Sequence, residues 1–452
     1  MKIFIFLFSV VCFFLISNST LSTWESLSIA LTIFFFLEFL QDLGKKIVIL
    51  YLPGLMALLT WLVMPVIFYH VYTKADWQAH LWAKYMPVSS DRYFGFVVPG
   101  ALLFILGLRI PLGRSDINRN PQKYIDNVRE YLKDKPKLGL ILIGIGLASG
   151  VFDFLSPASL KQVFYLLEHL TYVGVFYVFY SPNKFKGYVS AGVIALTIAQ
   201  ALANGMFGEL IFISSLSFIL VMLGKKVSFR RKFAISIVGL FLVILTQSVK
   251  SQYRVRSWKE GTGSDPLYFA ELLGDKITDP SSMLDKDKLF FIAVRLNQGW
   301  LVAVTMDRVP RLFPYANGET IGESVAASFV PRFLWPDKPE AGGKANLKRF
   351  WGFEIRNFSM NIGPIGEAYA NFGEQGGIIY MFFYGLFFNF MLAMTLRLAE
   401  KTPTLILWLP FLFMYTITVE SDLLMTMNSV MKATLFTWIV FKVFKSGFHI
   451  QL

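Results

Sequence analysis

The sequence has few of the residues that metal-binding and disulfide-stabilised proteins depend on. Its 452 residues include one cysteine and four histidines, and only 16% of them are charged. The single cysteine, Cys12, excludes an internal disulfide and any site that needs two thiolates. A soluble domain of this size carries about 25% charged residues, so the low charge also argues against a soluble fold. Hydrophobic residues make up 55% of the chain instead.

The hydrophobic residues come in blocks near the length that crosses a bilayer, about 17–25 residues each. We therefore predict an all-α polytopic membrane protein, in contact with the lipid bilayer, that has about twelve transmembrane helices. The first block resembles a signal peptide, but no small-residue cleavage site follows it, so we expect a retained helix. The expected spans are 3–17, 24–40, 47–72, 93–111, 137–153, 163–181, 187–204, 206–223, 233–249, 376–396, 403–419 and 423–444.

The net charge of +13 does not indicate nucleic-acid binding, because no separate domain is visible that would hold a basic patch. Lys and Arg gather in alternate connections between the spans, for example in 109–137 and in "GKKVSFRRK". By the positive-inside rule these connections lie in the cytoplasm. We expect both termini there too.

This topology divides the chain into three parts. Residues 1–249 hold about nine spans, 250–375 form one large non-cytoplasmic loop with short helices, and 376–452 hold about three more spans. The few charges in or near the spans are expected to be interfacial, because they lie near helix ends: Glu38, His169, Glu209 and Glu420.

Cations stand out where the large loop begins. Lys250 and Arg254 are four residues apart and so share one face of a helix, and Arg256 follows. They fit either phospholipid headgroups or a phosphorylated ligand, because guanidinium groups bind phosphate in a bidentate way. Arg295, in "FFIAVRLNQGW", needs an anionic partner, which is either an acid of the same loop or a ligand.

Two further stretches of the loop draw attention. In "VPRFLWPDKP" the prolines predict a stiff, extended ribbon that presents Arg332, Trp335, Asp337 and Lys338. Trp335 there is either a sugar-stacking face or an interfacial anchor. In "GPIGEAYANFGEQGG" the glycines permit close backbone approach and positive φ, and Glu367 has no simple structural role. No histidine occurs in 250–375, which excludes a histidine triad or zinc site in that loop.

The stretches "PRFLWPDKP" and "GPIGEAYANFGEQGG", together with "RLNQGW" and "VKSQYRVR", resemble the bacterial oligosaccharide repeat-unit polymerases (Wzy-type O-antigen and exopolysaccharide polymerases). The resemblance covers residues 250–396 by motif. It implies a GT-C-like fold and a glycosyltransferase without metal or other cofactor. Such an enzyme moves a growing glycan from an undecaprenyl-pyrophosphate carrier onto an incoming undecaprenyl-pyrophosphate-linked oligosaccharide. The reaction takes place at the outer face of the bacterial cytoplasmic (inner) membrane, where a chain-length regulator protein is an expected partner.

The resemblance also gives the residues roles. Cations must stabilise the charge that develops on the pyrophosphate leaving group, and the acceptor hydroxyl needs a base. Glu367 is the first candidate for that base and Asp337 the second, while Trp335 and Tyr369 are candidates for sugar stacking. The candidate pyrophosphate ligands are Lys250, Arg254, Arg256, Arg295, Arg332 and Lys338.

Three other functions stay open. An O-antigen ligase belongs to the same class of enzymes, but such ligases tend to carry a histidine in the outer loop. A flippase or exporter of lipid-linked glycans would be expected to place its cations along a central membrane cavity. A scaffold protein of the cell envelope would use the stiff loop as a docking surface.

Overall fold

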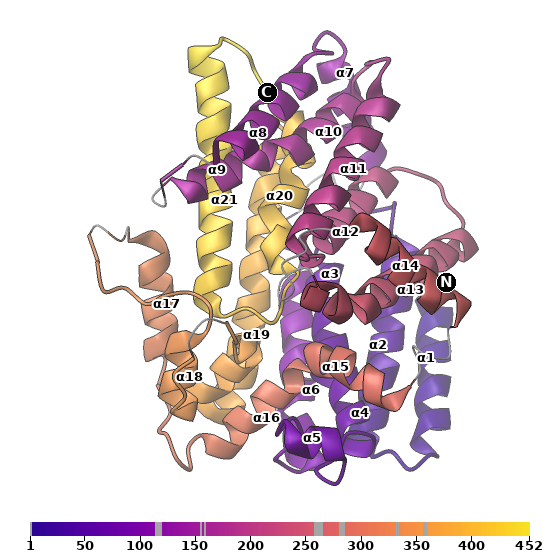
Figure 1. Cartoon of the computed structure of the whole chain (residues 1–452), viewed down its shortest axis with the longest axis vertical. Coiled ribbons are helices and arrows are strands. Elements are labelled where there is room, and N and C mark those ends of the chain that lie inside the picture. Colours follow the sequence, from indigo (N-terminus) through magenta and orange to yellow (C-terminus); the bar gives the residue numbers. More distant parts are fainter. Residues whose placement is uncertain are drawn as a thin grey trace.

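The computed structural model of the chain (Figure 1) consists of helices, and its described ranges contain no β-strand. These ranges are 2–113, 120–153, 156–157, 160–256, 265–279, 285–330, 332, 334–355 and 359–452. The first half holds α1 (Lys2–Ser17), α2 (Thr23–Asp42), α3 (Tyr51–Ala57), η1 (Leu58–Val63), α4 (Met64–His70), α5 (Trp77–Leu81), α6 (Ser90–Arg109), α7 (Pro121–Leu132), α8 (Leu138–Asp153), α9 (Lys161–Glu168), α10 (Leu170–Tyr180), α11 (Lys186–Asn204) and α12 (Gly208–Met222). The second half holds α13 (Phe229–Arg254), α14 (Pro266–Thr278), α15 (Lys286–Leu296), α16 (Gln298–Arg308), α17 (Glu319–Phe329), α18 (Lys344–Trp351), α19 (Gly363–Ala399), η5 (Pro403–Trp408), α20 (Leu409–Phe413), η6 (Met414–Thr416) and α21 (Leu423–Gly447).

The expectation of a polytopic α-helical membrane protein is confirmed. Among the described residues, 8 helices are long and apolar enough to cross a membrane, or up to 9 if the bent pair α15–α16 counts as one span. The twelve predicted segments are all helical. Those that are not among the 8 coincide with shorter apolar helices, namely α1, α8, α12 and the stretch from η5 to η6.

Two contacts bring together connections that the charge pattern assigns to the same side of the membrane. At one end Gly224 donates to the carbonyl oxygen of Gly44 (2.9 Å), and Tyr131 of α7 donates to the backbone oxygen of Leu452 (3.2 Å). All four residues belong to connections or termini expected in the cytoplasm. In Figure 1, α7 and the C-terminus lie at the top, while α5 and α16 lie at the bottom. Which end of the bundle faces the cytoplasm stays a prediction that rests on the positive-inside rule.

A close backbone contact joins α6 to α19. A Cβ atom on Gly107 would overlap the carbonyl oxygen of Phe382, and one on Gly385 would overlap that of Phe104. Small residues let helix backbones approach in this way, and such contacts drive helix association in lipid. The α6–α19 pair is therefore a rigid support that reaches the end of the bundle where α5 and α16 lie.

At that end α19 is interrupted at Gly373, whose φ of 67° and ψ of −162° are not helical. The positive φ expected of the glycines in this stretch is confirmed at Gly363 and Gly373. The segment before Gly373 is buried and carries Glu367 and Asn371, and the longer segment after it crosses the membrane region.

The region from 250 to 375 contains the expected short helices, α14 to α18, but they do not all lie on the surface. α15 and α16 meet at an angle of 66°. Most of α16 is buried, from Gln298 to Met306, and it packs against α19, η1 and α4. α17 packs along α21. The loop therefore forms one end of the helix bundle.

Candidate functional site

Three of the candidate cations lie close to one another. Lys250 and Arg254 lie one turn apart near the end of α13, and Arg295 lies near the end of α15. The charge of Lys250 interacts with those of both arginines and with that of Glu420. The Arg254 side chain donates to the carbonyl oxygen of Gly205 (2.7 Å), which fixes it against the end of α11. We refer to Lys250, Arg254 and Arg295 as the cation cluster.

Glu420 is the carboxylate at the centre of the cation cluster. It lies between η6 and α21, and its two oxygens accept from Arg295 (2.8 Å) and from the side chain of Gln298 (3.1 Å). Arg295 thus pairs with an acid of another connection and not with one of its own loop. The formal charge of these four side chains, Lys250, Arg254, Arg295 and Glu420, is +2, and a positively charged group attracts anionic ligands.

A second group of polar residues follows directly in the chain. The Asp422 side chain is 4% exposed and caps the N-terminus of α21 by accepting from the N–H of Met425 (2.6 Å). Its other oxygen accepts from the N–H groups of Gly342 (3.1 Å) and Gly343 (2.8 Å). Burial raises the pKa of the Asp422 carboxyl above its ordinary range, although these three donors favour the charged form. Asp422 thereby links the start of α21 to the loop that contains Gly342 and Gly343, which we call the glycine loop.

Glu367 lies behind this group and is 1% exposed. It accepts from the side chain of Asn346 (3.3 Å) and from the N–H of Leu423 (3.1 Å). The charges of Glu367 and Asp422 interact with each other. One short segment, 417–423, therefore connects the two groups. Its Glu420 pairs with Arg295 of the cation cluster. Asp422 is one of the two buried carboxyls, and the N–H of Leu423 donates to the other, Glu367.

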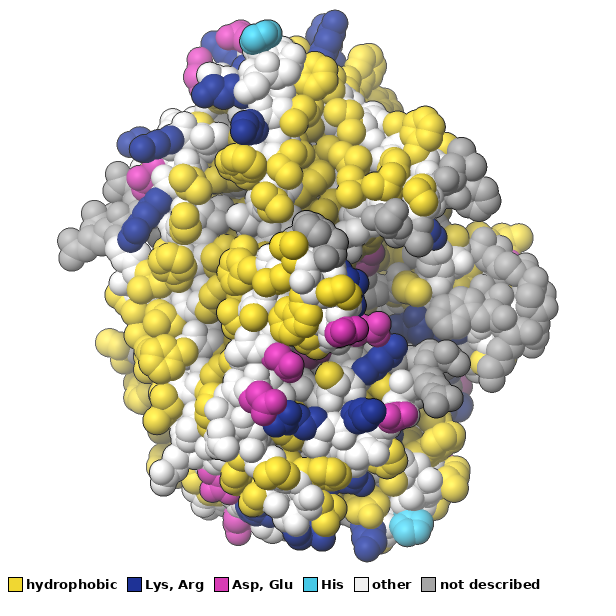
Figure 2. Space-filling view, turned by 90° about the vertical axis from the view of Figure 1, so that its left-hand side faces the viewer, with side chains coloured by type: hydrophobic (Ala, Val, Ile, Leu, Met, Phe, Trp, Pro, Cys, Tyr) yellow, Lys and Arg dark blue, Asp and Glu magenta, His cyan; other side chains and the backbone are white. Residues whose placement is uncertain are grey.

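A cavity of about 280 Å³ opens beside Asp422, between α17, α18 and the start of α21. Its lining is rich in hydroxyl, amide, carboxyl and amino groups, which include Ser324, Glu323, Asn346 and Lys348. Groups of this kind fix the orientation of a polar ligand. Figure 2 shows the face that lies on the left of Figure 1, where acidic and basic side chains form a group within a largely hydrophobic surface.

The predicted extended ribbon is replaced by turns in the described part of this stretch, since Lys338 N–H donates to the carbonyl oxygen of Trp335 (3.2 Å). Pro331 lies outside the described residues. Arg332 is exposed and donates to the carbonyl oxygen of Pro336 (3.1 Å). Asp337 is exposed and Trp335 is half-buried. This stretch is not extended, because the turn directs the Lys338 side chain inward, where it donates to the carbonyl groups at the end of α17.

Two more candidates lie apart from the cation cluster. Arg256 pairs with Asp265 (3.6 Å) and stacks on the ring of Tyr268 (4.1 Å to the centroid). Tyr369 is 1% exposed, its hydroxyl donates to the carbonyl oxygen of Val309 (3.2 Å), and it accepts from Arg92 (3.1 Å). In this structure the Tyr369 ring is therefore part of the core.

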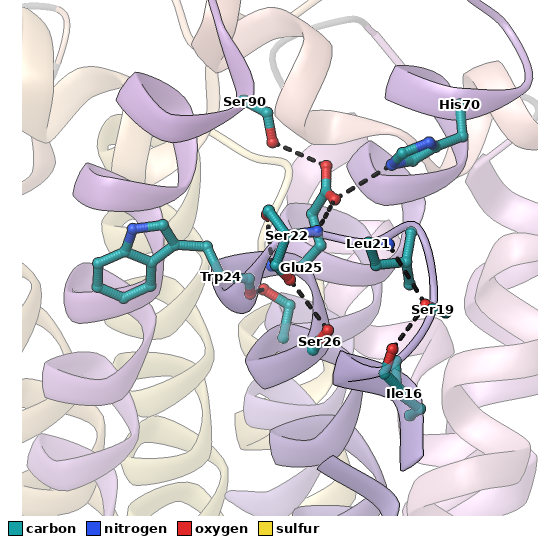
Figure 3. Close-up of polar contacts among 10 residues, drawn as sticks. Ile16, Ser19, Leu21, Ser22, Trp24, Glu25, Ser26, His70 and Ser90 are labelled. Carbon is teal, nitrogen blue, oxygen red and sulfur yellow. Dashed lines mark hydrogen bonds and ion pairs between the residues drawn. The ribbon is translucent and has the colours of Figure 1, made fainter. Parts of the chain in front are cut away.

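Several of the charges in and near the spans are paired. Figure 3 shows one case, in which Glu25 joins three helices. It accepts from the N–H of Ser22 (2.8 Å) at the start of α2 and from the hydroxyl of Ser90 (2.7 Å) on α6, and it contacts His70 of α4 (3.1 Å). Glu38 likewise contacts Arg109, and His169 contacts Glu209 (3.2 Å). These pairs link neighbouring helices.

Sequence reasoning missed three residues of the site: Gln298, Glu420 as the partner of Arg295, and Asp422. An acid directly before an apolar helix is a typical N-cap signal, so "ESDLL" pointed to Asp422 as a cap. Nothing in the sequence pointed to the glycine loop as its second partner. In the described part of the chain, no three His, Cys, Asp or Glu side chains are grouped so that they could hold a metal ion.

Comparison with known proteins gives one result. No curated protein and no solved structure matches the chain. Residues 121–446, from the start of α7 almost to the end of α21, match a family described as "Domain of unknown function (DUF8712)". The match includes the cation cluster, the glycine loop and both buried carboxyls. The chain therefore belongs to this family of unknown function.

Proposed function

We propose that the chain is a glycosyltransferase that polymerises undecaprenyl-pyrophosphate-linked oligosaccharide repeat units. In this proposal it is a GT-C-like enzyme with twelve spans in the bacterial cytoplasmic membrane. It works at the outer face, its termini lie in the cytoplasm, and a chain-length regulator is its partner. The observation that supports the proposal most strongly is the cation cluster, with its surplus of positive charge, next to two buried carboxyls.

The cation cluster suits a pyrophosphate leaving group. When the glycosidic bond to the carrier breaks, negative charge develops on the oxygen that stays with the pyrophosphate. Cations that are already in place stabilise that charge without reorganisation. Arg254 and Arg295 are held by the Gly205 carbonyl and by Glu420, so their positions are set before a ligand arrives.

The cavity beside Asp422 suits the acceptor sugar. A base must come within about 2.6–3.2 Å of the hydroxyl that it deprotonates. Asp422 borders the cavity, and three of the roughly four acceptor positions of its carboxylate are taken. Glu367, the first candidate from the sequence, sits behind Asn346. In our proposal Asp422 accepts the proton of the acceptor hydroxyl, and Glu367 supports the wall of the cavity. Asp337 is exposed on the adjacent loop.

The test uses protein in lipid nanodiscs and the undecaprenyl-pyrophosphate-linked repeat unit of its own host, with products separated by size. We expect a ladder from the wild type. Lys250→Gln should slow its formation about a hundredfold, since removing one group that stabilises the transition state costs about 3 kcal/mol. Arg311→Gln is the matched control, because Arg311 is exposed and pairs only with Asp307 of its own turn (2.8 Å) among the described residues.

The outcomes separate the candidate functions. A complete lack of ladder from authentic substrate would overturn the polymerase. Transfer of a single chain to a lipid A core would identify a ligase. Movement of the substrate across the membrane without a new glycosidic bond would identify a flippase. A ladder that is equally fast in Lys250→Gln would remove the cation cluster from the mechanism.

A further inference from the structure

Lys432 is a cation inside a span. It is the tenth residue of α21, so at 1.5 Å per residue it lies about 15 Å from the start of that helix. Its side chain is exposed and donates to the side-chain oxygen of Gln162 on α9 (3.4 Å). No acid pairs with it among the described residues. Charges within spans are costly, and they commonly mark a path or a site for a ligand.

A cavity of about 220 Å³ lies beside Lys432, between α9–α10, α20 and α21. Most of its lining is apolar and includes Leu166, Phe411, Met414 and Met425. Gln162, Asn428 and Ser429 add polar groups near the lysine. Pockets for drug-sized ligands are about 300–1,000 Å³, so this cavity has room for the first part of a chain and not for a whole carrier.

A second lysine, Lys338, lies close to Lys432. Lys338 donates to the carbonyl oxygens of Ala327 (2.9 Å) and Val330 (3.0 Å), and it lies close enough to Lys432 for their charges to repel each other. Lys338 likewise has no acidic partner in the described ranges. Lys432 lines the apolar cavity and Lys338 lies near Lys432. Two such cations, without an acidic partner among the described residues, are complementary to a lipid whose head carries phosphate.

The two cavities are lined by neighbouring residues of the same two segments. Ala341 lines the apolar cavity, and Gly343 lines the polar cavity that contains Asp422. At the start of α21, Leu424 faces the polar cavity and Met425 faces the apolar one. A lipid held in the apolar cavity would thus place its sugars close to the glycine loop, on the way to Asp422.

We infer that the apolar cavity binds the phosphate-bearing end of a second lipid-linked oligosaccharide, the acceptor, whose phosphates pair with Lys432 and Lys338. This inference rests on the proposed function, since a polymerase needs two lipid-linked substrates. In the proposal the donor occupies the cation cluster, and the 417–423 segment carries both Glu420, which pairs with Arg295, and Asp422. The two pyrophosphates are therefore held by different cations.

The experiment measures binding without turnover. The protein in phosphatidylcholine nanodiscs is photo-crosslinked with a diazirine-bearing farnesyl pyrophosphate, and labelled peptides are identified by mass spectrometry. We expect label on α9, α10, α20 or α21, about tenfold less label in Lys432→Gln, and retained label in Lys432→Arg. Lys442→Gln is the matched control, because Lys442 lies on the same helix against Trp438. Undecaprenyl pyrophosphate should compete for the site, and phosphatidylglycerol should not.

Absence of label from these helices, or equal label in Lys432→Gln, would overturn the inference. Equal competition by phosphatidylglycerol would also overturn it, since the cavity would then be an ordinary phospholipid site. The proposed function fails in a different way. Label on these helices without any polymer ladder would support the site and overturn the polymerase, whereas a normal ladder without label would do the reverse.

Discussion

Two substitutions in the cation cluster should change anion binding in opposite directions. Lys250→Gln removes a cation and lowers the net charge of the cluster with Glu420 from +2 to +1. Glu420→Gln removes the acid that pairs with Arg295 and raises the formal charge of these four side chains to +3. We expect inorganic pyrophosphate to bind more weakly to the first variant and more tightly to the second.

The magnitude follows from the arrangement of the charges. A unit charge about 6 Å from a bound phosphate contributes about 0.7 kcal/mol in water and about 2.8 kcal/mol at the effective dielectric constant of 20 found near protein surfaces. Arg295 is 65% exposed in its pair with Glu420, so its interactions lie toward the weaker limit. Loss of the pair itself costs at most about 1 kcal/mol. A net effect near 1 kcal/mol corresponds to about fivefold in Kd for either variant.

Titration calorimetry of the nanodisc-embedded protein would measure this effect at low and high salt. The Lys250→Gln/Glu420→Gln double variant restores the net charge of +2, so its affinity should return close to that of the wild type. Both single effects should shrink as salt screens the charges. Weaker binding by Glu420→Gln would refute the reasoning, because Glu420 would then act as a scaffold for Arg295 and not as an opposing charge.

Two further predictions concern stability. Gly385→Ala should destabilise the protein by about 3 kcal/mol, the upper end for overpacking, because the new methyl group meets the backbone of α6; Gly239→Ala, with open space around it, should change the thermal unfolding midpoint little. The second prediction concerns Asp76, which pairs with Lys286 (2.6 Å). Burial raises the pKa of the Asp76 carboxyl. The hydrogen bonds from Lys286, Ala79 and Gln78 outweigh burial and hold this pKa below its ordinary 3.8. The pair therefore stabilises the fold above about pH 3.8 and is lost as pH falls through the folded pKa, so the difference in midpoint between Asp76→Asn and wild type should shrink at acidic pH; a constant difference would contradict this.

The spans were predictable because lipid solvates apolar side chains, and a helix must stay apolar over the thickness of the bilayer. Hydropathy alone could not separate the long helices from shorter ones such as α8 and α12, since both read as apolar runs. The burial of α16 was hidden for a different reason. Its flanking charges, Arg295 and Arg308, resemble those of a surface helix, and only tertiary packing shows that the residues between them are enclosed.

The candidate site was predictable where it depends on local spacing. Lys250 and Arg254 share a helical face, and this follows from the four-residue interval. The partner of Arg295 lies 125 residues away, and the N–H donors of Gly342 and Gly343 lie 80 and 79 residues before Asp422. Such pairs arise when α21 packs against the 250–375 region. No rule of local sequence specifies them.

The 417–423 segment has a thermodynamic consequence. When an anion binds the cation cluster, Glu420 must weaken its ion pair with Arg295 or share Arg295 with the anion, and the same segment carries Asp422, the proposed base for the acceptor. In the proposed mechanism the donor and acceptor positions are therefore not independent. By linkage, whatever factor an occupied donor position imposes on acceptor affinity is imposed equally by the acceptor on the donor. In the proposed mechanism this seven-residue segment couples the two substrate positions, and its stiffness sets how strongly the binding of one substrate changes the affinity for the other.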